Sequence, residues 1–150
     1  MSYMFSNCTL LKSIDFTNFN TSLVTDMSYM FYNCIQLESI NLSNFDTSNL
    51  INMAGMFYDC IKLISLDLTY LNTTSVQNME FMFSGCNSLK SIDFSKFDSK
   101  SAINMSYMFN KCSSLSSIDF SSFTKSSVEE MRYMFCDCII LSSLDLSNFD

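Results

Sequence analysis

Cysteine is the most reactive side chain in this sequence, and six of the seven cysteines recur at intervals of 26 residues. Thiols could bind a metal ion or form disulfides. Metal sites, however, normally use closely spaced ligands such as C-x-x-C, and the chain has no histidine. Cysteines stacked in register also fit poorly with the roughly 90° torsion of a disulfide. We therefore expect buried free thiols in one row, and no metal or cofactor. The row is Cys8, Cys34, Cys60, Cys86, Cys112 and Cys138.

Cys136 lies outside this row. It replaces Ser, Tyr or Asn at a position that faces outward in the other repeats. Because this position faces outward, we expect Cys136 to be the most exposed cysteine of the chain.

A second row at the same interval is acidic. Stacked carboxylates about 5 Å apart repel each other, and a calcium ion could relieve that repulsion. The chain lacks the dense Asp/Gly loops of calcium-binding repeats, which favours a solvated face over a calcium site. A uniform row also offers nothing to separate two carboxyl pKa values, so catalytic carboxylates are not expected. The row is Asp15, Asn41, Asp67, Asp93, Asp119 and Asp145.

A third row is mainly aromatic. An exposed aromatic stripe often marks a binding surface. The alternative is that these rings cover the seams between repeats. The row is Tyr3, Tyr29, Gly55, Phe81, Tyr107 and Tyr133, and Tyr32 and Tyr58 fall on the same outer side.

Composition restricts the class of protein. The 150 residues are 48% hydrophobic and 15% charged, which excludes an ordinary disordered chain. A net charge of −7 makes nucleic acid a poor partner. The absence of histidine removes the commonest general base. We expect no membrane span, because no apolar run approaches the roughly 18 residues that one needs, and no signal peptide in this chain.

One 26-residue unit, repeated without insertion or deletion, generates all three rows. No change in composition marks a linker. We therefore expect a single solenoid domain, residues 1–150, in which stacked repeats close a continuous core. The five complete repeats are 1–26, 27–52, 53–78, 79–104 and 105–130, and a truncated sixth is 131–150.

Each unit contains two hydrophobic periods. Met27, Met30, Phe31 and Cys34 have the i, i+3, i+4, i+7 spacing of one helical face. Asp26 precedes them, and Asp is a good N-cap. The interpretation is a short helical turn, with a 3₁₀ turn as the alternative.

The second period is L-x-x-L-x-L, as in Leu37, Ile40 and Leu42. The last two apolar positions alternate with polar residues, which is typical of a short strand with one buried side. We therefore expect an α/β solenoid, with one short parallel β-strand and one short helical turn in each repeat.

L-x-x-L-x-L is the strand of a leucine-rich repeat. The longer unit M-x-x-M-F-x-x-C-x-x-L-x-S, followed by Ile or Leu, Asp or Asn, and Phe or Leu, resembles the BspA-like leucine-rich repeat surface proteins along the whole chain. The asparagine that usually follows the strand is replaced by Phe19 and its equivalents. The resemblance implies a right-handed, curved solenoid at the cell surface of host-associated bacteria and some protists, with adhesion to host proteins and no catalytic residues.

The chain starts at a repeat methionine and stops within a repeat, and it lacks the export signal, anchor and capping repeats of that family. The expectation is a fragment of a longer protein. Uncapped repeats would expose core and sheet edges, which favours end-to-end self-association.

The leading hypothesis is a non-enzymatic surface module that binds a protein partner, such as a host or extracellular-matrix protein. The alternative is a structural spacer with no specific ligand, and an enzyme is the least favoured class. The candidate binding residues are Asp67, Asp93 and Asp119 on the strand face, and Tyr29, Tyr32 and Tyr58 on the aromatic face.

Overall fold

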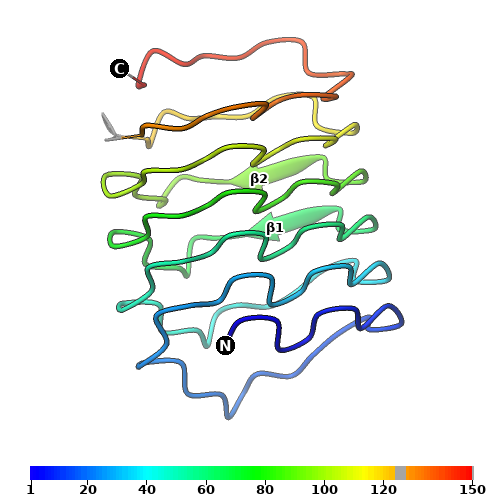
Figure 1. Ribbon diagram of the computed structural model, residues 1–150. Coiled ribbons are helices and arrows are strands. Elements are labelled where there is room, and N and C mark those ends of the chain that lie inside the picture. The colour runs from blue at the N-terminus through cyan, green and yellow to red at the C-terminus, as the bar shows by residue number, and fades with distance from the viewer. Residues whose placement is uncertain (124–127, 150) are drawn as a thin grey trace.

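Backbone hydrogen bonds join each repeat to the next at a constant offset. The computed structural model describes residues 1–123 and 128–149, and in it the repeats stack in chain order, with the two termini at opposite ends (Figure 1). In repeat 27–52, every second N–H of the first segment donates to a carbonyl 25 residues further along. The bonds are Met27 to Asn52, Tyr29 to Ala54, Phe31 to Met56 and Asn33 to Tyr58, at 2.9, 2.7, 2.9 and 2.8 Å.

The regular strands are short. Strand β1 (Ser65–Asp67) and strand β2 (Ser91–Asp93) form a two-stranded parallel sheet. Leu66 pairs with Ile92, and Asp67 with Asp93. Among the described residues, the equivalent positions of the other repeats are not assigned to strands. The parallel pairing is as expected, but in the described residues regular strands extend over two repeats only, and the other repeats are joined by isolated parallel bridges such as Asp26 with Asn52.

The expected helical turns are not found, because the described part of the chain contains no helix. The segment forms consecutive β-turns, in which the N–H of Met30 donates to Met27 and that of Cys34 to Phe31. Tyr29 and Asn33 have φ values of 54° and 57°. A positive φ at the third residue of such a turn is the mark of type II.

The helical turns are absent because two sets of acceptors compete for the backbone N–H groups of this segment. A helix uses every interior N–H within its own segment, whereas here alternate N–H groups bond to the next repeat. The β-turns still turn Met27, Met30, Phe31 and Cys34 inward, and all four are buried. The spacing therefore predicted the buried face correctly and the local conformation wrongly.

Rows of identical side chains fill the core. The phenylalanines of the turn segment stack with ring centroids 5.5–5.9 Å apart and planes within 15° of parallel. Offset-stacked rings add stabilisation beyond their buried area. The row is Phe5, Phe31, Phe57, Phe83, Phe109 and Phe135.

Three columns of Asp or Asn hold the bends of each repeat. In every member, Oδ1 accepts the N–H of the residue two positions later, which is an Asx-turn. The strand-face column is Asp15, Asn41, Asp67, Asp93, Asp119 and Asp145. The second column is Asn20, Asp46, Asn72 and Asp98, and the third is Asp26, Asn52, Asn78 and Asn104.

The third column contains the residues expected to cap helices. They do bind a free N–H, but at a β-turn rather than at a helix start. Glu130 occupies this position in the fifth repeat, and in the described residues its carboxylate makes no such bond. Glutamate has a longer side chain than Asp or Asn and is less common at such capping positions.

A buried threonine column links the repeats on the inside. Thr47, which is 2% exposed, donates its hydroxyl to the Asn72 carbonyl at 3.0 Å and accepts the Asn72 N–H at 2.7 Å. Thr73 makes the same pair of bonds to Asp98. A buried hydroxyl satisfied in this way avoids the cost of an unpaired polar group.

Central and terminal phenylalanines should contribute differently to stability. Phe57 and Phe83 are fully buried, whereas Phe135 is only partly buried. We expect Phe57→Ala and Phe83→Ala each to lower the free energy of unfolding by about 3–5 kcal/mol, and Phe135→Ala by less. Denaturant unfolding measures all three, and equal losses would contradict the stacked arrangement.

Candidate functional site

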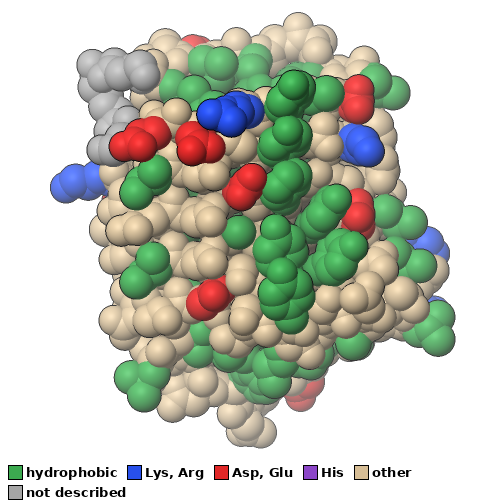
Figure 2. Space-filling view, in the orientation of Figure 1, with side chains coloured by type: hydrophobic (Ala, Val, Ile, Leu, Met, Phe, Trp, Pro, Cys, Tyr) green, Lys and Arg blue, Asp and Glu red, His purple; other side chains and the backbone are tan. Residues whose placement is uncertain are grey.

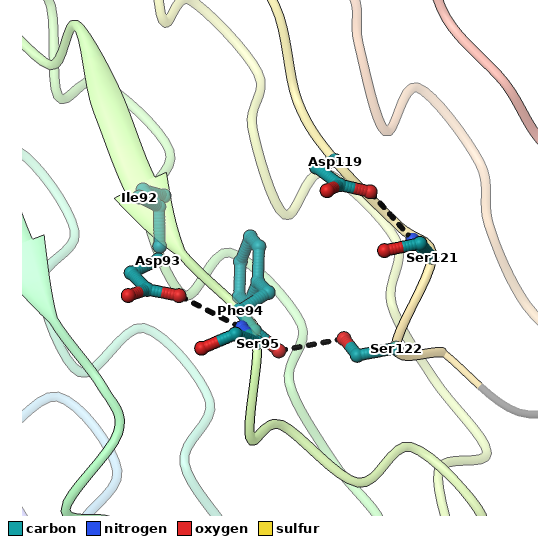
Figure 3. Close-up of a pocket in the computed structure, with 7 residues that line it drawn as sticks. All are labelled: Ile92, Asp93, Phe94, Ser95, Asp119, Ser121 and Ser122. Atoms are coloured by element: carbon teal, nitrogen blue, oxygen red, sulfur yellow. Dashed lines mark hydrogen bonds between the residues drawn. The ribbon is translucent and has the colours of Figure 1, made fainter.

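A pocket opens on the strand face between the fourth and fifth repeats. It encloses about 270 Å³ and is lined by Ile92, Asp93, Phe94, Ser95, Asp119, Ser121 and Ser122. Figure 3 shows Asp93 and Asp119 on two neighbouring segments of chain, with the Phe94 ring between these segments. The lining combines carboxylates and hydroxyls with a buried aromatic side chain.

Both carboxylates of the pocket are held by their own turns. Asp93 Oδ1 accepts the N–H of Ser95, and Asp119 Oδ1 accepts that of Ser121, both at 2.8 Å. Hydrogen bonds from Ser95 lower the pKa of Asp93, and those from Ser121 lower the pKa of Asp119. The pocket therefore presents two ionised carboxylates at neutral pH.

A serine hydroxyl ties the two sides of the pocket together. Ser122 Oγ donates to the Phe94 carbonyl at 2.6 Å (Figure 3). No strand pairing extends from β2 to the next repeat among the described residues. This side-chain bond spans the gap between the two segments.

The structure places the six candidate residues on two separate features. Asp93 and Asp119 share the pocket. Asp67 lies outside it but is paired in register with Asp93. Tyr29, Tyr32 and Tyr58 belong to the turn segments and take part in ring stacking there.

The aromatic side chains form one continuous ladder. Neighbouring ring centroids lie 4.6–6.2 Å apart, and every pair is stacked except Tyr29–Tyr32, which is edge-on. Figure 2 shows a column of hydrophobic side chains crossing the repeats on this face. The ladder runs through Tyr3, Tyr29, Tyr32, Tyr58, Phe81, Tyr107 and Tyr133.

Stacking covers much of this ladder. The end members Tyr3 and Tyr133 are 56% and 62% exposed, and the five inner rings are half-buried. Burial raises the pKa of Tyr29 and of Tyr58. The rings therefore cover the seams between repeats, and only part of their surface can reach a partner.

Gly55 has no ring, so the row of stacked rings does not pass through its position. Its φ is +57°, and a Cβ atom built there would lie 2.3 Å from Cε1 of Tyr29. The Tyr29 ring therefore occupies the space above Gly55, and the ladder continues through Tyr32 and Tyr58 to Phe81. The missing side chain makes room for this detour.

The cysteine row does more than fill space. In each repeat after the first, the thiol donates to the phenylalanine carbonyl of the preceding repeat at 3.1–3.2 Å, as in Cys60 to Phe31 and Cys86 to Phe57. All seven cysteines are free thiols. Burial raises the pKa of Cys34 to about 11, and that of Cys60 still further.

Three expectations about cysteine exposure need correction. Cys8 was expected to be buried but is exposed, because no repeat precedes it in this chain to cover the thiol. Cys138 was also expected to be buried with the row but is only partly buried. Cys136 was expected to be the most exposed cysteine but is only partly exposed, and Cys8 is more exposed. Position along the stack thus decides exposure more than orientation within the repeat.

The described residues lack two features that often accompany function. They contain no group of three or more His, Cys, Asp or Glu side chains that could hold a metal ion. They also contain no helix with the length and hydrophobicity to span a membrane.

Stacked 26-residue units, joined by in-register hydrogen bonds, define this chain as a repeat protein. A family model described as "Mycoplasma protein of unknown function, DUF285" matches residues 1–94 and 64–150. These two matches together cover the whole chain, which belongs to this family.

Among solved structures, the chain is similar to the crystal structure of a T. pallidum leucine rich repeat protein. The two are 23% identical with a TM-score of 0.43, over 69% of this chain and 55% of the other. The chain thus spans about half the length of that protein. None of the curated proteins compared with the chain matches it.

Sequence reasoning identified Asp93 and Asp119 but missed Ser121, Ser122 and the Phe94 carbonyl. The recurring D-x-S or D-x-T pattern was the signal for the Asx-turns. The pocket had no such signal, because the residue types that line it recur in the other repeats.

Thiol reactivity should follow position in the stack. We expect a thiol reagent to label native Cys8 first, Cys136 and Cys138 more slowly, and Cys34, Cys60, Cys86 and Cys112 only after denaturation, because burial disfavours the reactive thiolate. Mass spectrometry of digested protein identifies the labelled sites. Rapid labelling of Cys60 or Cys86 in folded protein would be incompatible with the buried row.

Proposed function

We propose that this chain is a non-enzymatic interaction module of a BspA-like cell-surface protein, and that it mediates adhesion to host or extracellular-matrix proteins. Its strand face carries the binding residues, with Asp67, Asp93 and Asp119 at the centre. The proposal includes no catalytic residue, metal or cofactor.

The pocket between Asp93 and Asp119 is the observation that carries this proposal. It is a concave polar site on the strand face, and its two carboxylates are ionised. A stack of repeats also offers a long surface on which a partner can contact several units at once.

The aromatic ladder is the less favoured binding face. Its inner rings are already half-buried against each other. Contacts there would persist at high salt, because tyrosine buries apolar area. Contacts to the aspartates would weaken as salt screens their charge.

A structural spacer is the second candidate function. The observation in its favour is the regularity of the stack, in which the same hydrogen bonds recur from repeat to repeat. Core positions that are uncovered in the terminal repeats, such as Met4 and Leu146 at 51% and 38% exposure, favour end-to-end self-association of the isolated 150-residue chain. Sedimentation at several concentrations measures that association.

Two triple variants separate the faces. We expect Asp67, Asp93 and Asp119 changed together to Asn to abolish most binding to immobilised extracellular-matrix proteins at low salt, since the charges are lost but the turns remain. We expect Tyr29, Tyr32 and Tyr58 changed together to Ser to keep binding, provided that thermal unfolding shows the variant to be folded.

The matched control changes Asp26, Asp46 and Asp98 to Asn, which removes the same charge from the other two Asx-turn columns. This control should bind normally. Loss of binding in the folded tyrosine variant alone would transfer the site to the aromatic face. Normal binding by all three variants would favour the spacer.

A further inference from the structure

The two end faces of the stack carry complementary backbone groups. In residues 27–33 and the equivalent segments, alternate N–H groups donate to carbonyls 25 residues further along. Within the described residues, three of these N–H groups in the last repeat make no hydrogen bond, and three of the matching carbonyls in the first repeat accept none. One end face therefore donates where the other accepts. The donors are Tyr133, Phe135 and Asp137, and the acceptors are Ser2, Met4 and Ser6.

Core side chains are uncovered at the same two faces. Met4 is 51% exposed, whereas its equivalents in the five later repeats are at most 4% exposed. Leu146 is 38% exposed, whereas its equivalents in the five earlier repeats are at most 3% exposed. The preceding repeat therefore covers the methionine position, and the following repeat covers the position of Leu146. A junction between the two end faces buries both side chains, which is favourable because apolar surface leaves water.

A single register satisfies both faces. When Tyr133 of one copy is placed next to Tyr3 of a second copy, the three N–H donors meet the three carbonyls in order. The two rings, which are 62% and 56% exposed, then extend a row in which neighbouring rings stack at 4.6–5.0 Å. The Cys8 thiol meets the Phe135 carbonyl, as each later thiol of the row meets the carbonyl of the preceding repeat. The contacts are those of a junction inside the chain.

The end faces cannot pair with their own kind in this way. Two first repeats placed face to face would oppose carbonyl to carbonyl in the turn segment, and two last repeats would oppose donor to donor. The two termini lie at opposite ends of the stack (Figure 1), so a head-to-tail contact leaves one face open at each end. Such a heterologous contact extends by further copies instead of closing as a symmetric dimer.

Electrostatic repulsion opposes this contact without excluding it. The chain has a net charge of −7, and this register brings Asp145 next to Asp15. The chain already tolerates the same arrangement inside the stack, where Asp67 and Asp93 pair directly. Salt screens like charges and does not weaken the burial of apolar surface, so the association should strengthen as salt is added.

We propose that the 150-residue chain binds a second copy of itself head to tail, with repeat 131–150 of one copy seated on repeat 1–26 of the next. The result is a linear assembly with one direction, in which the 26-residue period continues across each junction. This inference goes beyond the proposed function, because it uses the end faces, while the strand face and the aromatic ladder lie along the sides of the assembly.

Two variants each block one face. Met4→Asp places a charge on the first-repeat face, and Leu146→Asp places one on the last-repeat face. Ile61→Asp is the matched control, because Ile61 is 39% exposed in a central repeat and gains the same charge. Sedimentation velocity over a range of concentrations should show association of the unmodified chain, weakened by less than about twofold in the control. Each blocked variant alone should associate at least about tenfold more weakly, because an unpaired charge is costly to bury.

Mixing the two blocked variants tests the direction of the contact. Each variant retains the face that the other lacks, so an equimolar mixture should form a one-to-one dimer through one intact junction and grow no further. In that dimer the Cys8 thiol of the Leu146→Asp copy is covered. A thiol reagent should therefore label this cysteine several-fold more slowly in the mixture than in the variant alone, and mass spectrometry distinguishes the two variants.

Three results would overturn the inference. The first is an unmodified chain that stays monomeric at every concentration. The second is self-association of either blocked variant, which would indicate contact between like faces. The third is equal weakening by Ile61→Asp, which would indicate unspecific apolar contact.

Circular dichroism checks that each variant is folded, as we expect because both substituted side chains are already partly exposed. Cys8 labelling of the unmodified chain tests the same junction without any substitution. It should slow as the protein concentration rises, and a constant rate would contradict the head-to-tail contact. Binding of immobilised matrix proteins by the strand face is a separate measurement, so either proposal can fail while the other stands.

Discussion

The stack of repeats depends on how the backbone N–H groups of each turn segment are divided between acceptors in the same repeat and acceptors in the next one. Within each turn segment, alternate N–H groups bond to the next repeat, and those between them close β-turns in their own repeat. This arrangement satisfies the backbone of a segment that has neither helix nor regular strand. It also fixes the offset between repeats at one value, which brings each side chain against its counterpart from the neighbouring unit.

Because the offset is constant, side chains at equivalent positions of neighbouring repeats contact each other, so the properties of one position are repeated along the stack. Apolar positions become stacked rows, such as the phenylalanines, and their buried area grows with each added repeat. Cys and Thr use the same proximity to bond to a neighbouring backbone. At a charged position the effect reverses, because Asp67 then faces Asp93. On the strand face, stacking therefore brings like charges together, while hydrogen bonds within each turn stabilise the ionised form of Asp93 and Asp119.

The buried rows could be predicted from the sequence, because period and hydrophobicity alone decide which side chains face the core. Met27, Phe31, Cys34 and Leu37 are all buried as predicted. The turn conformation could not be predicted, since two helical turns and a run of type II turns place the same residues inward. The Asp93–Asp119 pocket was equally hidden, because the residue types that line it recur at the equivalent positions of other repeats.

Both glycines of the chain lie where a side chain of the preceding repeat leans over the backbone, Tyr29 over Gly55 and Asp59 over Gly85. At each of these two junctions between repeats, the glycine therefore provides the space that the side chain of the preceding repeat occupies. Recombination that deletes or duplicates a whole 26-residue unit recreates the backbone hydrogen bonds, but it can place a different residue opposite Tyr29 or Asp59 in place of the glycine. The array can change length freely by such exchanges only where its junctions are interchangeable, and these two junctions are not.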